Sequence, residues 1–146
     1  MPEFHLDHGT PEAARTFASL DSFTQGYIEA MFFTNASDPD DGDLDGATFA
    51  ELAPESLAKI IADCEAFQAG LPRDSLGRSL LDLAYDYAPN EYDAERAGND
   101  YWYTRNGHGT GFWDRGLGEV GEALATAARY SNVDLYRGDD GQIYLG

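Results

Sequence analysis

The stretch YWYTRNGHGTGFWDRG, residues 101–116, decides how the C-terminal third of the chain is expected to fold. Two aromatic runs flank a segment rich in glycine and asparagine, the residues that most readily reach positive φ. Aromatic side chains favour a pleated, half-buried surface. The pattern therefore predicts strands at residues 101–104 and 112–114, joined by a tight reversal.

Two interpretations of this stretch compete. In the structural one, Trp102 and Trp113 are core anchors and the arginines pair with acidic residues of the surface. In the functional one, the loop is a small enzyme or ligand-binding site, with side chains of the types that serve as base, orienter and anion clamp. The residues of that alternative site are Arg105, Asn106, His108, Asp114 and Arg115. It requires a concave pocket at the sheet edge, lined by His108, on which the two arginines converge.

The chain downstream of this stretch contains a helical pattern and a hairpin pattern. Apolar residues at helical spacing predict a helix that includes Leu117, Val120, Leu124 and Ala127. The runs VDLY and QIYL, joined by the turn RGDDG, predict an antiparallel hairpin.

Upstream, two long helices are predicted. The first covers residues 11–34, with Thr10 as N-cap before a proline and with a break near Gly26. The second begins near Pro54 and ends at Gly70, where a glycine is followed closely by a proline. Its apolar face carries Leu57, Ile60, Ile61, Cys64 and Phe67.

A third helix is predicted over residues 74–87, and residues 90–97 add a short helical turn that ends at Gly98. The inward side chains of the third helix are expected to be Leu76, Leu80, Leu83, Ala84 and Tyr87. Helices first and strands mostly last predict an α+β fold. We expect a single domain over residues 1–146, with about four helices and a small antiparallel sheet of three to four strands formed mainly by residues 101–146.

The charge is the strongest compositional signal. The chain has 27 acidic and 9 basic residues, a net charge of −18, and 21 of the acids lie in residues 1–100. Such a surface repels phosphate backbones, so direct nucleic-acid binding is not expected. No apolar run approaches the ~20 residues that span a bilayer, and the N-terminus has no secretion-signal pattern. The sequence therefore predicts a cytoplasmic protein without a membrane partner.

Two segments are expected to lie outside the packed core. Residues 1–9 are predicted to be a loose terminus, and residues 35–49 an acidic loop. Within that loop, DGDLDG reproduces the opening of a calcium-binding EF-hand loop, with Asp41, Asp43 and Asp45 as the oxygen ligands. The closing glutamate is missing, because position twelve of the loop is Leu52. An acidic connector without metal or cofactor is therefore expected here.

Two further interpretations of the acidity remain open. The acids either serve solubility or salt adaptation alone, or imitate nucleic-acid phosphates and occupy a basic groove on a partner protein. The candidate partner-binding residues are Asp38, Asp40, Asp41, Asp43, Asp45, Asp82, Asp86, Glu91, Asp93 and Glu95. Association through them should weaken steeply with salt.

Two segments carry a resemblance to known proteins. The chain resembles a family of small acidic proteins encoded by bacteriophages, prophages and plasmids. The resemblance lies in the run TRNGHGTGFWDRGLGEVGEAL, continued by VDLYRGDDGQIY, and in the run LAPESLAKIIADCEAF. The resemblance covers about two-thirds of the chain and implies a context without a mechanism. By analogy with acidic phage proteins that mimic DNA, it favours a non-enzymatic interaction protein that engages a basic host protein in nucleic-acid handling or defence.

Overall fold

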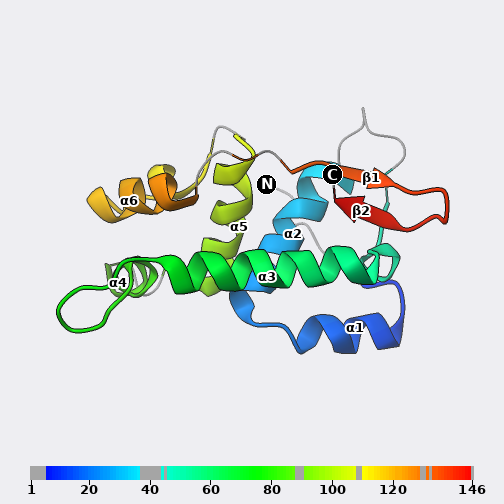
Figure 1. The fold of residues 1–146 in the computed structure, drawn as a ribbon, viewed down its shortest axis with the longest axis horizontal. Coiled ribbons are helices and arrows are strands. Elements are labelled where there is room, and N and C mark those ends of the chain that lie inside the picture. Colours follow the sequence, from blue (N-terminus) through cyan, green and yellow to red (C-terminus); the bar gives the residue numbers. More distant parts are fainter. Residues whose placement is uncertain are drawn as a thin grey trace.

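Two helices, α2 (Ser22–Ala36) and α5 (Ala94–Arg105), cross at the centre of the protein (Figure 1). The computed structural model describes residues 6–36, 44, 46–87, 91–107, 110–128, 131 and 133–145. At the crossing, two glycines let the backbones touch. A Cβ added to Gly98 would lie 1.9 Å from the carbonyl oxygen of Phe23, and one added to Gly26 would lie 1.9 Å from that of Glu95. Only glycine fits at either position.

The other elements surround this crossing. Helix α3 (Pro54–Gly70) runs across it, with α1 (Pro11–Ala18), α4 (Leu80–Tyr87) and α6 (Glu119–Ala128) at the periphery (Figure 1). The remaining elements of the described residues are two single 3-10 turns and two strands. The turns are η1 (Phe49–Glu51) and η2 (Phe112–Asp114), and the strands are β1 (Leu135–Arg137) and β2 (Ile143–Leu145). The strands pair antiparallel, with Leu135 opposite Leu145. The fold is therefore α+β, as predicted, but the described residues form six α-helices instead of about four and a two-stranded sheet instead of three or four strands.

Aromatic rings fill the centre. Trp102 is 1% exposed and meets Tyr27 edge to face, with ring centroids 5.4 Å apart. The ring of Phe67 lies between those of Tyr101 and Phe112, at centroid distances of 4.3 and 5.9 Å. This stack joins α3, α5 and η2 in one core.

Three predicted elements are confirmed. Helix α3 has the predicted bounds, and it buries Ile60, Cys64 and Phe67. Helix α6 also forms, although it begins at Glu119 and leaves Leu117 outside, and so does the C-terminal hairpin. The hairpin is fixed to the start of α3, because the amide of Ala53 donates to the carbonyl oxygen of Ile143.

The predicted strands at residues 101–104 and 112–114 are wrong. Residues 101–104 continue α5, which begins after Asp93, whose carboxylate caps the helix by accepting from the amide of Arg96. Gly98 does not end a helix as expected, because it provides the contact with α2. Residues 112–114 form η2, and only one of the two tryptophans is a core anchor: Trp113 is 46% exposed.

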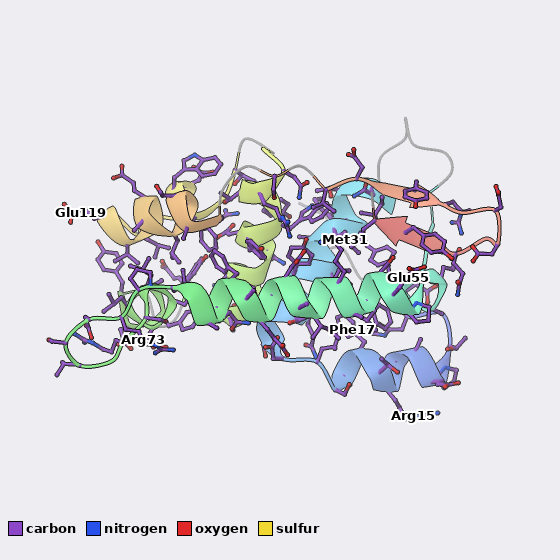
Figure 2. All side chains as sticks on the ribbon, viewed as in Figure 1. Arg15, Phe17, Met31, Glu55, Arg73 and Glu119 are labelled. Atoms are coloured by element: carbon purple, nitrogen blue, oxygen red, sulfur yellow. The ribbon has the colours of Figure 1, made fainter. Side chains whose placement is uncertain are left out.

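The predicted break near Gly26 is also misplaced. The break falls at residues 19–21, where the amide of Ser19 ends α1 and the Asp21 carboxylate caps α2 through the amide of Thr24. The predicted N-cap of α1 is confirmed, since Thr10 accepts from the amide of Ala13. Figure 2 shows Phe17 between α1 and α3, whereas Arg15 points away from the protein.

The predicted helix over residues 74–87 is half as long as expected. Asp74 accepts from the amides of Leu76 and Arg78 and pairs with the Arg78 guanidinium, so residues 73–79 close into a turn before α4 begins. Leu76 and Tyr87, predicted to face inward, are 75% and 65% exposed.

The described part of the N-terminal segment is attached to the core, although we expected residues 1–9 to be loose. The amides of Phe49 and Ala50 donate to the carbonyl oxygens of Asp7 and His8. The His8 ring lies 4.7 Å from that of Phe17. Residues 6–9 therefore hold α1 beside η1.

Within the described residues, no helix is both long enough and apolar enough to cross a bilayer.

Candidate functional site

In the loop site suggested at residues 105–115, the structure does not bring the two arginines together. Arg105 and Arg115 form separate ion pairs, with Asp63 and Asp100. Asn106 accepts from the amide of Val133 and so holds the segment before the hairpin. Asp114 is exposed and accepts from Thr110, while His108 lies outside the described residues. The two arginines therefore do not converge in the described structure, and a role for His108 stays a prediction.

Arg105 is a buried structural residue. It donates to the hydroxyls of Tyr27 and Ser131 and to the Asp63 carboxylate, at 3.1, 3.0 and 3.2 Å. Its guanidinium carbon lies 5.2 Å from the centre of the Tyr101 ring. Burial raises the pKa of the Tyr27 hydroxyl, so this group stays protonated and donates or accepts without charge. The guanidinium is thereby surrounded by protein groups.

Arg115 has a different environment, because its partner is the buried group. The Asp100 side chain is 1% exposed, while that of Arg115 is 36% exposed. The Nε and Nη2 atoms of Arg115 donate to Asp100 at 2.9 and 2.7 Å, and the Tyr92 hydroxyl donates at 2.8 Å. Burial raises the pKa of the Asp100 carboxyl, against the lowering effect of these hydrogen bonds. The hydrogen bond with Asp100 raises the pKa of Arg115.

This ion pair is part of a pocket of about 450 Å³, which we call the α5 pocket. Arg115 forms one wall, and the rest of the lining comes from α5 and the turn before it: Glu91, Tyr92, Arg96, Asn99, Asp100 and Tyr103. Most of these residues are spaced three or four apart, so they lie on one face of the helix. Asn99 is fixed because its side-chain amide donates to the carbonyl oxygen of Gly26 at 2.6 Å. Sequence reasoning named two of the lining residues, Arg115 in the suggested loop site and Glu91 among the partner-binding acids.

A second feature is a group of carboxylates, the acidic cluster: Asp21, Glu29, Asp82, Asp93 and Glu95. Asp21 lies at the start of α2, Asp82 in the first turn of α4, and Asp93 at the N-cap of α5. All three affect the pKa of the Tyr85 hydroxyl. Burial raises the pKa of the Tyr85 hydroxyl, and the charges of Asp82, Asp93 and Asp21 raise it further. Carboxylates distant in sequence therefore lie around one tyrosine.

The other two members form a close pair across the α2–α5 crossing. Burial raises the pKa of the Glu29 carboxyl to about 7, and the charge of Glu95 and a hydrogen bond with it contribute in the same direction. Two carboxylates that share a hydrogen bond hold one proton between them more firmly than either would alone. This pair exists because the backbones of α2 and α5 touch one turn away, at Gly26.

The predicted partner-binding residues are partly brought together. Asp82, Asp93 and Glu95 belong to the acidic cluster, and Asp86 and Glu91 are exposed on or next to the same elements. The remaining candidates lie outside the described residues: Asp38, Asp40, Asp41, Asp43 and Asp45. Asp21 and Glu29 were missed. The signal for Asp21 is its position before Ser22 and Phe23 as an N-cap, and that for Glu29 is an acid within a strongly apolar run.

The basic residues are largely neutralised within the chain. Five of the eight described ones form ion pairs with acids: Lys59, Arg78, Arg105, Arg115 and Arg137. Arg15, Arg73 and Arg96 form no ion pair with another described residue. None of the five members of the acidic cluster is an acid of these ion pairs among the described residues.

No group of three or more His, Cys, Asp or Glu side chains suited to a metal ion occurs in the part of the chain that the structure describes. The calcium-type ligands considered from the sequence, Asp41, Asp43 and Asp45, lie outside that part. Cys64 is buried, and burial raises the pKa of its thiol to about 12, which is opposite to what a nucleophile needs.

Comparison of the chain with protein-family models, curated proteins and solved structures finds no match.

Proposed function

We propose that this protein is a non-enzymatic interaction protein of the phage type, whose acidic face docks in a basic groove of a host protein that handles nucleic acid or takes part in defence. The observation that carries the proposal is the acidic cluster, in which carboxylates from α2, α4 and α5 lie close together. Closely spaced negative charges on a rigid support resemble the phosphates of a nucleic acid. The site of action would be the host cytoplasm.

The energetics of the cluster favour a partner that supplies positive charge. Like charges held together repel one another, and the raised pKa of Glu29 is the sign of that repulsion together with burial. A basic groove would relieve the repulsion and guide association over a distance, an effect that salt weakens. Acids kept for solubility alone have no such need to converge.

The test is a capture experiment with three forms of the immobilised protein and a bacterial lysate. The first is the native chain, and the second carries D82N, D93N and E95Q in the cluster. The third carries E55Q, E65Q and E119Q, which remove the same number of charges from exposed positions on α3 and α6. All substitutions keep side-chain size, and asparagine remains a good N-cap at position 93.

We expect the native chain to capture a set of proteins at low salt and to release them in high salt and on addition of duplex DNA. The cluster variant should lose most of this DNA-displaceable fraction, and the control variant should keep it. Equal loss in both variants would show that the acidity acts only through net charge. Capture that is insensitive to salt would contradict electrostatic docking.

A further inference from the structure

The α5 pocket carries an unused binding edge of an arginine. A guanidinium can present two parallel N–H groups on its Nε/Nη2 side and two more on its Nη1/Nη2 side. Asp100 takes the first side of Arg115, through Nε and Nη2. The second side donates to no other described residue, the side chain is 36% exposed, and Arg115 is one of the residues that line the pocket.

The position of this arginine is fixed in advance. Asp100 is buried and accepts three hydrogen bonds from Arg115 and one from Tyr92, so the guanidinium has a rigid counterpart beneath it. An arginine held by a buried carboxylate loses little further conformational freedom when an oxyanion binds its other side. This preorganisation distinguishes Arg115 from the exposed Arg15.

Two further groups complete the pocket. Arg96, one turn before Asp100 on the same face of α5, is exposed and has no ion pair with another described residue, so it adds positive charge at the rim. The Tyr103 ring, one turn after Asn99, supplies an aromatic wall. Two negative charges oppose an anion here: Glu91 is exposed on the rim, and the charge of Asp114 contributes to the raised pKa of Arg115. A volume of about 450 Å³ is in the range of small-molecule sites.

We infer that the α5 pocket binds a small molecule that joins a ring to a carboxylate or phosphate group, with the oxyanion on Arg115 and Arg96 and the ring against Tyr103. The pocket adjoins the proposed acidic face and shares Glu91 with its candidate residues. The inference does not rest on the docking proposal, because its binding groups are Arg115, Arg96 and Tyr103 and its test measures a small molecule.

The test is a titration of isotope-labelled protein followed by two-dimensional NMR with four probes. Benzoate and phenyl phosphate carry the two oxyanions on one ring, benzamidine carries a positive charge on the same ring, and inorganic phosphate has no ring. We expect saturable shifts at Arg115 Nε–H, Asn99 and Tyr103 with benzoate or phenyl phosphate, with dissociation constants on the order of millimolar. Benzamidine and inorganic phosphate should bind more weakly. The stronger of the two ring oxyanions identifies the group.

Charge variants at the rim sharpen the test without disturbing the buried pair. R96Q should weaken binding about two- to five-fold, and E91Q should strengthen it about two-fold, because the two side chains act with opposite sign on an anion. R15Q, an exposed arginine on α1, is the matched control and should leave binding unchanged (Figure 2). R115K keeps a positive charge beside Asp100 but removes the second planar edge, and should weaken binding at least about ten-fold.

Several outcomes would overturn the inference. These are the absence of saturable shifts at the pocket, tighter binding of benzamidine than of either ring oxyanion, equal binding of inorganic phosphate, or an equal effect of R15Q and R96Q. If R115K does not give a native spectrum, R96Q and E91Q still decide the result, since both residues are exposed.

Discussion

Helix α5 has two faces that are built in different ways. The face towards α2 is packed backbone against backbone and ring against ring, and it buries Ala97, Gly98, Tyr101, Trp102 and Arg105. The other face is polar and lines the pocket with Arg96, Asn99, Asp100 and Tyr103. Shape positions the first face, whereas the second is organised by the Arg115–Asp100 ion pair, the Tyr92–Asp100 hydrogen bond and the hydrogen bond from Asn99 to the carbonyl oxygen of Gly26. The comparison suggests that packing on one side leaves the other side free to carry binding groups.

The core face should be the more sensitive of the two. Replacing Trp102, which is 1% exposed, by alanine removes the largest buried side chain and the ring contact with Tyr27. We expect W102A to lower the free energy of unfolding by about 3–5 kcal/mol, which is most of the stability of an ordinary domain. Urea denaturation followed by circular dichroism measures the change.

Trp113 is the matched control, because the same side chain is 46% exposed at that position. W113A should lower the free energy of unfolding by no more than about 0.5 kcal/mol. Similar losses of stability for W102A and W113A would mean that the Trp113 side chain is buried rather than half exposed.

A smaller change tests the helix crossing itself. In G98A the new methyl group would meet the carbonyl oxygen of Phe23, and the backbone of α2 has to move to admit it. We expect a loss of about 2–3 kcal/mol, in spite of the better helix propensity of alanine. G70A provides the control, since the last residue of α3 has open space around the added methyl group and should be neutral or slightly stabilising. Equal changes in stability for G98A and G70A would contradict the close contact of Gly98 with the backbone of Phe23.

The pocket face should respond to loss of its ion pair. R115M leaves the Asp100 carboxylate buried without its cation, and we expect a loss of about 2 kcal/mol, less than for a fully buried pair because Arg115 is partly exposed. The double variant R115M/D100N removes the charge as well and should regain at least half of that loss. Thermal melts of the two variants measure the difference in stability. If the double variant is no more stable than R115M, the unpaired Asp100 charge is not the cause of the loss.

The smallest effect concerns pH. The pKa of Glu29 is about 7 in the folded protein against 4.5 in the unfolded chain, so the folded state binds the proton more tightly. This contribution to stability is complete below the unfolded value and is lost as the pH rises towards 7. Between about pH 5 and pH 8 it should fall by roughly 1–2 kcal/mol. Urea denaturation across that range measures the fall.

Two variants separate the causes of this pH dependence. E29Q should abolish the fall, and E95Q should reduce it, because burial of Glu29 remains when its charged neighbour is removed. E65Q, an exposed residue of α3, should leave the profile unchanged. An unaltered profile in E29Q would assign the titration to another group.

The predictable elements are those whose signals are local. Helix α3 has a proline at its first position, a periodic apolar face and a glycine at its end, and its bounds agree with the prediction. The C-terminal hairpin likewise follows from alternation and turn residues adjacent in sequence. In both cases the neighbours along the chain contain the information.

The unpredictable elements depend on contacts between distant residues. From the sequence, Gly98 resembles a helix end and the aromatic run after it predicts a strand; only the contact with Phe23 of α2 explains why the helix continues. The α5 pocket has the same origin, since Arg115 meets Asp100 only once η2 folds back on α5. Of the candidate site, the sequence indicated acids of α4 and α5, but their grouping with Asp21 and Glu29 required the fold.

The backbone contacts of Gly26 with Glu95 and of Gly98 with Phe23 also limit motion. Helices that touch through their backbones have no side chains that can change rotamer to let one slide past the other, so local opening there requires the two helices to separate. Amide hydrogens in the middle of α2 and α5 should therefore exchange with solvent only in the globally unfolded state. The pocket and the Glu29–Glu95 pair are attached to these two helices, which hold both in a fixed position. We expect amide hydrogens in the turn at residues 73–79 and at the tip of the hairpin to exchange many times faster than those of the two helices.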